Sequence, residues 1–212
     1  MAGMVKGALI AVVVMATVGT AGACLFVRTT GLSARAVPGR VETAVARRIR
    51  AFATPADSRD RVNPILATEE SIRNGMAHFA DHCASCHAND GGGDTGMGKG
   101  LFPPAPDMRG PATQTLTDGE LFYIIEHGVR FTGMPAWSTG TEEGEEASWH
   151  LVNFIRHLPQ ITPEQLEEMA GINPRPPDEI RQEIEAERFL AGEDLEPEAP
   201  ADDAPAPASS PA

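Results

Sequence analysis

The chain has 212 residues and a formal net charge of −13, and that charge is unevenly distributed. Residues 1–66 carry nine Lys or Arg against three Asp or Glu, whereas residues 67–212 carry eight against 27. The strong negative charge of residues 67–212 argues against a nucleic-acid-binding protein and suits contact with a basic protein surface. Aromatic residues make up 5% of the chain, with 21 Gly and 18 Pro. This composition predicts one small domain with a modest core and long flanking segments.

Within the N-terminal residues 1–27, Gly7–Val27 forms an apolar run. At about 1.5 Å per residue, a helix of this length crosses a hydrocarbon core of about 30 Å. Three interpretations fit: an uncleaved transmembrane anchor, a signal peptide cleaved near Ala23, and a lipoprotein whose mature N-terminus is Cys24. We favour the anchor, because residues 25–27 continue the apolar run beyond the cleavage site.

Residues 28–66 are predicted to form a basic tether that ends near Asn63-Pro64. Apolar side chains recur in it at helical spacing: Val41, Val45, Ile49 and Phe52. This spacing predicts an amphipathic helix over Val41–Ala53, which either lies on anionic lipid headgroups or serves as a solvated spacer. Six arginines between positions 28 and 50 follow the apolar run and only Lys6 precedes it, so the positive-inside rule alone places the C-terminal side in the cytoplasm.

The central domain is predicted over residues 67–160. Thr68 is a suitable N-cap, and a helix follows it with one apolar face: Ile72, Met76, Phe79 and Ala80. This helix leads directly to Cys83. The glycines of residues 91–100 predict a long loop, and the prolines of residues 102–106 exclude regular helix there.

Two further helices complete the predicted domain. Thr117 and Glu120 form a capping-box pattern that opens a helix reaching Val129. Four positions form the expected buried side of this helix: Leu121, Ile124, Ile125 and Val129. The last helix of the domain is predicted over Glu145–Leu158, because Pro159 cannot continue it.

Residues 161–190 are predicted to form a helical extension, and residues 191–212 a disordered tail. Thr162 opens a helix to about Ala170, and Pro177–Leu190 reads as a charged helix with little apolar face. The tail is rich in Ala, Pro, Asp and Glu and buries too little apolar surface to order itself. No segment alternates as a strand would, so the fold class is predicted to be all-α.

The sequence Cys83-Ala84-Ser85-Cys86-His87 indicates the chemistry of the chain. Two thiols at this spacing add to the two vinyl groups of one haem, and the adjacent imidazole of His87 lies under the iron. A thioredoxin-like cysteine pair would follow a strand, and a zinc site would need two further ligands at compatible spacing. We therefore expect one haem c, attached covalently through Cys83 and Cys86, with His87 as an iron ligand.

The second axial ligand has to come from another part of the chain. Met97, Met108 and Met134 are the methionine candidates. We favour Met134, because the turn around Gly133-Met134-Pro135 presents its thioether without helical constraint. A thioether opposite an imidazole stabilises ferrous iron and raises the reduction potential. Three side chains are candidates for binding the haem propionates through cationic or N–H donors: Lys99, Arg109 and Trp137.

This order of motifs resembles the class I cytochrome c family, over about residues 68–160. The likeness rests on the haem motif and the Met134 loop, with support from three further segments: Gly75–Phe79, Ala105–Met108 and Trp149–Phe154. It implies a small all-α fold of three to four helices around one covalent haem, in which the N- and C-terminal helices of the domain cross.

The resemblance also implies particular contacts. At the helix crossing, Gly75 and Phe79 are expected to meet Trp149 and Phe154. The Pro106 carbonyl is expected to accept a hydrogen bond from the His87 ring, which would fix the imidazole and tune the iron.

The function that the resemblance implies is one-electron transfer, by a tethered shuttle or by the cytochrome subunit of a membrane oxidoreductase. Its partners would be redox proteins, the electron donor and acceptor. Haem attachment of this kind occurs outside the cytoplasm, so we expect a membrane-anchored domain on the periplasmic side, against the positive-inside rule. Two alternatives stay open: a peroxidase-like haem enzyme, which needs an open iron position, and a haem-based sensor.

Overall fold

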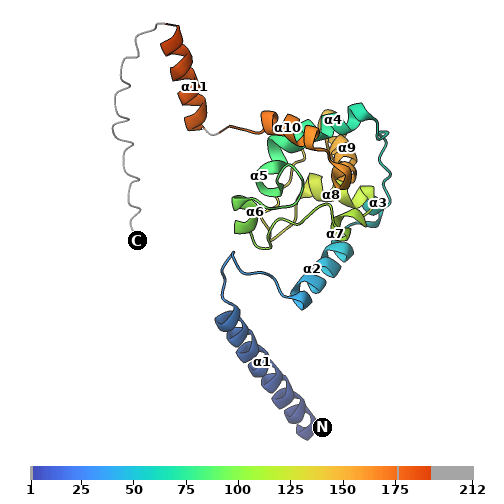
Figure 1. Cartoon of the computed structure of the whole chain (residues 1–212). Coiled ribbons are helices and arrows are strands. Elements are labelled where there is room, and N and C mark those ends of the chain that lie inside the picture. Colours follow the sequence, from blue (N-terminus) through green and yellow to red (C-terminus); the bar gives the residue numbers. More distant parts are fainter. Residues whose placement is uncertain (1, 176, 192–212) are drawn as a thin grey trace. The chain divides into compact units, whose positions relative to one another are not determined.

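The computed structural model describes residues 2–175 and 177–191. Every regular element in these two ranges is helical, which confirms the predicted all-α class (Figure 1). The chain divides into two compact units, residues 1–173 and 174–212. Apart from Ala191, the predicted disordered tail lies outside the described residues.

The N-terminal segment begins with helix α1, Ala2–Thr30. Within α1, Val5–Thr29 is long and apolar enough to cross a membrane, a test that a signal sequence also meets. Helix α2, Arg40–Ala53, follows after residues 31–39 and matches the predicted amphipathic helix within one residue.

The end of the predicted tether packs against the domain. Helix α3, Ala56–Arg59, lies against helix α8, Asp118–His127. A Cβ atom added to Gly119 would lie 2.1 Å from the Ser58 carbonyl oxygen, so only glycine allows this close approach. The guanidinium of Arg61 lies 4.3 Å from the centre of the Phe122 ring. This part of the segment therefore belongs to the packed unit rather than to a free tether.

A continuous helical rod leads into the cysteine motif. Helix α4, Glu69–His78, passes into a π-helical turn, η1, Phe79–Cys83, and then into helix α5, Ala84–His87. As predicted, Thr68 caps α4, and its hydroxyl accepts a hydrogen bond from the Ser71 amide at 3.1 Å. The π-helical turn was not predicted, because it changes the hydrogen-bonding register without changing the pattern of apolar residues.

Helix α9, Glu142–His157, crosses α4 and forms the main helix pair of the core. A Cβ atom on Gly75 would lie 2.1 Å from the His150 carbonyl oxygen and 2.8 Å from the Phe154 Cβ atom. The Phe79 and Phe154 rings lie 5.1 Å apart, which confirms that expected contact. The helices cross closely because α4 carries no side chain at Gly75.

The atoms nearest to a Cβ atom on Gly75 belong to His150 and Phe154, and the expected contact with Trp149 stays a prediction. Trp149 stacks on Phe122 of α8 with ring centres 4.1 Å apart. Helix α9 also begins three residues before the predicted Glu145, because the Thr141 hydroxyl caps it by accepting from the Gly144 amide at 3.1 Å.

The capping box of α8 forms as predicted: the Thr117 hydroxyl accepts from the Glu120 amide at 3.1 Å, and the Glu120 carboxylate accepts from the Thr117 amide at 2.9 Å. The helix ends before Val129, because Gly128 takes a φ of +64°. Leu121 and Ile125 are buried as expected, whereas Ile124 and Val129 are half-buried. Gly119, Phe122 and Glu126 occupy the other buried positions.

The C-terminal extension begins with a 3₁₀ turn, η2, Leu158–Gln160, and helix α10, Pro163–Ile172. Met169 of α10 is fully buried, and α10 packs against α4 and η1. Helix α11, Pro177–Leu190, forms where the charged helix was predicted and belongs to the second compact unit.

The close helix crossing predicts that Gly75→Ala destabilises the domain. The new methyl group would contact the His150 backbone, and such overpacking costs about 1–3 kcal/mol. Gly171→Ala in α10 is the matched control, because a Cβ atom there meets nothing within 4 Å. Denaturant unfolding followed by circular dichroism compares the two variants. Equal unfolding midpoints would contradict the account of the crossing.

Candidate functional site

The cysteine motif lies at the end of the helical rod formed by α4, η1 and α5. Cys83 is the last residue of η1, and Cys86 and His87 lie on α5. Neither cysteine forms a disulfide, and both are half-buried. His87 is buried, with its ring centre 6.4 Å from that of Phe79. One helical stretch therefore holds two thiols and an imidazole close together.

The buried His87 ring is suited to metal ligation. Burial lowers its pKa, whereas the Pro106 backbone carbonyl raises it to a smaller extent. The net direction favours neutral imidazole, the form that binds a metal. The Nδ1 atom is buried without a hydrogen-bond partner, so the Pro106 carbonyl is near the ring but outside hydrogen-bonding geometry. An unpaired buried nitrogen is costly unless ligand binding reorients the ring to satisfy it.

The Cys83 thiol is strongly disfavoured as a thiolate. Burial, and to a smaller extent the neighbouring Cys86, raises the pKa of Cys83 to about 12. A redox-active cysteine needs the opposite shift, because the thiolate is the reactive form. Across residues 2–175 and 177–191, no three His, Cys, Asp or Glu residues are grouped to hold a metal ion. The raised pKa of Cys83 argues against the thioredoxin-like interpretation.

A short helix in the predicted glycine loop supports the motif. Residues 91–100 were expected to be loop throughout, but Gly96–Gly100 forms helix α6. The Thr95 hydroxyl accepts from the Gly98 amide at 2.8 Å and donates to the Cys86 carbonyl at 3.1 Å. A Cβ atom on Gly98 would lie 2.1 Å from that same carbonyl oxygen. Thr95 and Gly98 thus hold α6 directly against the motif.

Left-handed backbone positions fold the following segment back toward His87. Ala88 and Gly93 have φ values of +59° and +75°. The Gly93 amide donates to the His87 carbonyl at 2.8 Å, and a Cβ atom on Gly93 would lie 2.4 Å from the Ala105 carbonyl oxygen. This packing places the chain at Pro106 beside the histidine.

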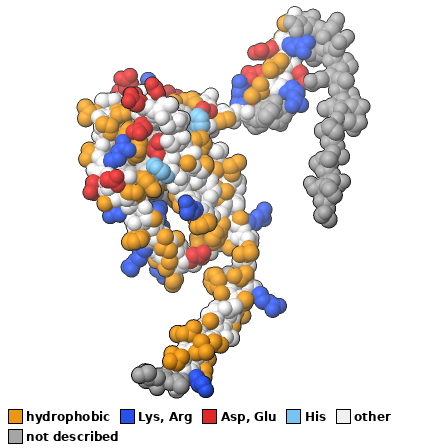
Figure 2. Space-filling model, turned by 180° about the vertical axis from the view of Figure 1, so that it is seen from behind, with side chains coloured by type: hydrophobic (Ala, Val, Ile, Leu, Met, Phe, Trp, Pro, Cys, Tyr) orange, Lys and Arg blue, Asp and Glu red, His pale blue; other side chains and the backbone are white. Residues whose placement is uncertain are grey.

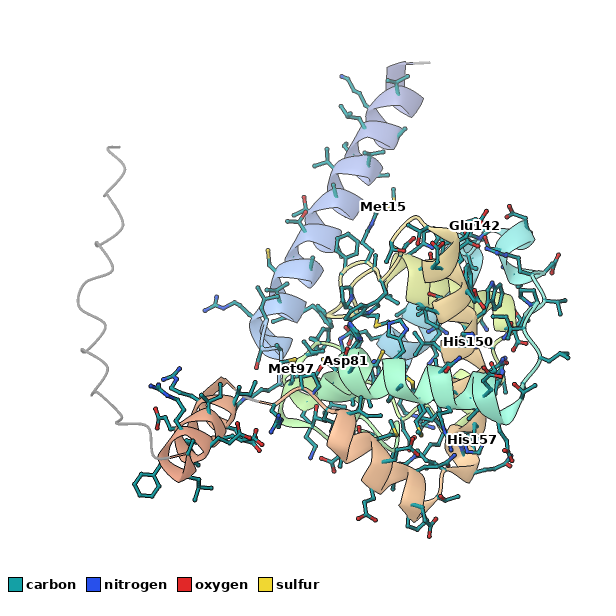
Figure 3. All side chains as sticks on the ribbon, turned by 90° about the horizontal axis from the view of Figure 1, so that it is seen from above. Met15, Asp81, Met97, Glu142, His150 and His157 are labelled. Atoms are coloured by element: carbon teal, nitrogen blue, oxygen red, sulfur yellow. The ribbon has the colours of Figure 1, made fainter. Side chains whose placement is uncertain are left out.

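The three candidate methionines lie in different environments. Met97 on α6, labelled in Figure 3, is 60% exposed, and Met108 is 9% exposed within the hydrophobic core. Met134 is half-buried in the irregular loop that follows α8. Its carbonyl accepts from the Val129 amide and its amide donates to the Thr132 hydroxyl, both at 3.1 Å. Met134 therefore combines a fixed backbone with a side chain outside the core cluster.

The candidate propionate ligands are held in different ways. The Arg109 guanidinium donates to Asp107 at 2.8 Å and to Asp90 at 2.6 Å. Lys99 forms an ion pair with Asp94. The structure thus gives both cations carboxylate partners.

Trp137, the third candidate, lies beside the cysteine motif. It is half-buried, and its ring lies edge-on to that of His82 at 5.4 Å, next to Cys83 in the chain. His78 lies edge-on to His82 at 4.9 Å and extends this aromatic row along the rod.

Sequence reasoning did not identify Thr95, Gly98 or Asp90 as supports of the site. The first two carry a local signal, since threonine three residues before a helical amide is an N-cap pattern. The pairing of Asp90 with Arg109 spans 19 positions, so no local pattern reveals it.

One hollow on the described surface lies away from this motif. Its volume is about 330 Å³, and it is lined by residues that include Arg61, Ile65, Glu145 and Trp149. None of its lining residues belongs to the cysteine motif or to the Met134 loop, so it does not bear on this chemistry.

Comparison with known proteins places the motif within a matched region. Residues 70–155 match the family model described as cytochrome C oxidase, cbb3-type, subunit III. The match runs from the second residue of α4 to Ile155 in α9 and includes the cysteine motif and Met134. No curated protein matches this chain.

The raised pKa of Cys83 predicts how this thiol reacts in protein whose cysteines are free. Its alkylation rate by iodoacetamide should rise about tenfold per pH unit from about pH 8 to about pH 11, because the thiolate fraction does. In guanidinium the same residue should follow the ordinary pKa of 9.0 and its rate should level off. Mass spectrometry of the alkylated peptides gives both rates. A plateau near pH 9 in folded protein would contradict the burial of this thiol.

Proposed function

Because residues 70–155 form a class I c-type cytochrome domain, we propose that this chain is a one-electron carrier with a single haem c ligated by His87 and Met134. In general, a domain of this family binds haem and transfers electrons. The carrier role, the covalent attachment and the ligand pair are the specific parts of the proposal. The neutral, buried imidazole of His87 next to two half-buried thiols is the observation that supports it most.

The motif residues have distinct roles in this proposal. Cys83 and Cys86 would each form a thioether with one vinyl group of the haem. Because a thioether has no ionisable proton, the raised pKa of the free Cys83 thiol does not oppose this attachment. The Nε2 atom of His87 ligates the iron, and its Nδ1–H donates to the Pro106 carbonyl. That hydrogen bond would satisfy the buried nitrogen that otherwise has no partner.

Bound haem c supplies reversible one-electron chemistry between ferrous and ferric iron. The thioether of Met134 would ligate the iron opposite His87, would favour the ferrous state and would keep substrates from the iron. This assignment is supported by the fixed backbone of the Met134 loop and argues against a peroxidase-like enzyme, which needs an open position. Phe79 is fully buried with its ring 6.4 Å from that of His87, so it helps to keep water from the imidazole.

Arg109 and Trp137 are proposed to bind the haem propionates. Arg109 would have to share its guanidinium with Asp90 and Asp107, which hold it in place. Trp137 would donate from its indole N–H, and its position near His82 keeps it next to the motif.

The membrane arrangement follows from α1 and from the family. We propose that α1 anchors the chain and that the haem domain lies on the periplasmic side. The matched family takes its description from an oxidase subunit, which favours a redox partner in a membrane oxidase complex. This chain would act either as a subunit of that complex or as a tethered shuttle that exchanges electrons with it. Figure 2 shows acidic side chains gathered on one part of the compact unit, which suits a partner with a basic docking surface.

Optical spectra of methionine variants test the ligand assignment. Ferric wild-type protein, produced with export and haem attachment, should be six-coordinate and low-spin with the weak red absorption band that a methionine–iron bond gives. Met134→Ala should lose this band and become high-spin. Met97→Ala, at an exposed position, and Met108→Leu, which preserves core volume, should keep it.

The same spectra can also contradict the assignment of Met134. If the band persists in Met134→Ala and disappears in Met97→Ala or Met108→Leu, the second ligand is not Met134. A high-spin wild-type spectrum would overturn the closed-iron carrier altogether.

A further inference from the structure

Helix α2 presents its apolar side chains to the outside of the protein. Val41, Val45, Ile49 and Phe52 have exposed fractions of 78%, 50%, 61% and 91%. They recur every three or four positions and so form a single stripe along α2. No residue of α2 is buried. The stripe is therefore uncovered along its whole length.

The opposite side of α2 faces the protein. Thr43 and Arg50, seven residues apart, lie on the side opposite Val45 and are half-buried. Burial lowers the pKa of Arg50, and the charge of Glu120 on α8 raises it to a smaller extent. An amphipathic helix of a water-soluble domain normally turns its apolar stripe inward. Helix α2 has the reverse orientation, and its apolar stripe is exposed.

A lipid bilayer is the nearest apolar phase available to α2. Nine residues, 31–39, separate α1 from α2, and nine extended residues span at most about 30 Å. If α1 crosses the membrane, α2 cannot leave its surface by more than that distance. The helix also carries Arg40, Arg47, Arg48 and Arg50 against the single carboxylate of Glu42. At 100° per residue, Arg48 lies at the edge of the stripe, whereas Arg47 and Arg50 lie on the opposite side. A helix with an apolar stripe and an excess of arginine favours a surface that is both apolar and anionic.

We propose that the apolar face of α2 binds the surface of a bilayer that contains anionic phospholipid, next to the point where α1 enters it. This inference rests on the anchoring role of α1 that is part of the proposed function. Val41, Val45, Ile49 and Phe52 enter the boundary between headgroups and acyl chains, and Arg48, at the edge of the stripe, contacts lipid phosphates.

Binding of α2 would also orient the haem domain. The Arg59 guanidinium donates to the Ala51 carbonyl of α2 at 2.7 Å and pairs with Glu120 of α8 at 3.7 Å. Together with the half-buried Arg50, these contacts couple α2 to the packed unit. A lipid-bound α2 therefore fixes one side of the domain toward the membrane and keeps electron transfer close to partners in the same bilayer.

A fluorescence experiment on the full-length holoprotein tests this proposal. An environment-sensitive fluorophore is attached at Val45→Cys, on the apolar stripe, or at Thr43→Cys, on the opposite side, both in a Cys24→Ser background. Mass spectrometry checks that the label is at the intended position. The protein is added to neutral phosphatidylcholine vesicles and to vesicles with a third phosphatidylglycerol, and co-flotation is measured in parallel.

The expected result is a blue shift at position 45 and not at position 43, in the anionic vesicles and not in the neutral ones. Raising the salt concentration to 1 M should reverse the shift. Arg48→Gln should weaken it, since an arginine near an anionic surface contributes about fivefold in binding. Co-flotation with neutral vesicles should persist in every case, because α1 provides it.

Each contrary outcome identifies what fails. Co-flotation without a shift at position 45 in anionic vesicles overturns lipid binding by α2 and leaves the anchor intact. A shift that occurs without vesicles shows that protein covers the stripe, for example a second copy, and also overturns the proposal. Loss of co-flotation with neutral vesicles, with the anionic shift retained, overturns the anchor while α2 still binds lipid.

Discussion

The close crossing of α4 and α9 at Gly75 is the constraint on which the rest of this structure depends. Because Gly75 lacks a side chain, the His150 backbone and Phe154 approach α4 directly. Helix α4 then continues without a break through the π-helical turn to Cys83 and His87. The crossing therefore determines the position and direction in which the two thiols and the imidazole are presented.

Contacts on either side of the motif complete this arrangement. Helix α6 is held against the Cys86 carbonyl by Thr95 and Gly98, and α10 packs against η1 through a segment that includes the buried Met169. The matched region ends at residue 155, before α10 begins. Part of the support for the site thus comes from outside the region that the family comparison covers.

Local patterns in the sequence predicted the helix starts that depend on a threonine N-cap. Thr68, Thr117 and Thr162 act as caps in the structure as the sequence indicated, because capping depends on residues only three positions apart. The partner of Trp149 and the packing of Ser58 on Gly119 were not foreseen, because distant segments meet there. Helix α6 was missed because five residues that include three glycines have low helix propensity, and packing against Cys86 overrides it.

The same distinction separates the two proposed iron ligands. His87 follows from its place next to Cys86, whereas Met134 lies 47 positions further on and stays a prediction that only its loop geometry supports. The most direct test of the closed-iron carrier is to expose the reduced protein to carbon monoxide and record its visible spectrum. The account predicts no change, because Met134 occupies the second axial position. Prompt formation of a carbon monoxide adduct would contradict it and indicate an open iron that could bind a substrate or a signal.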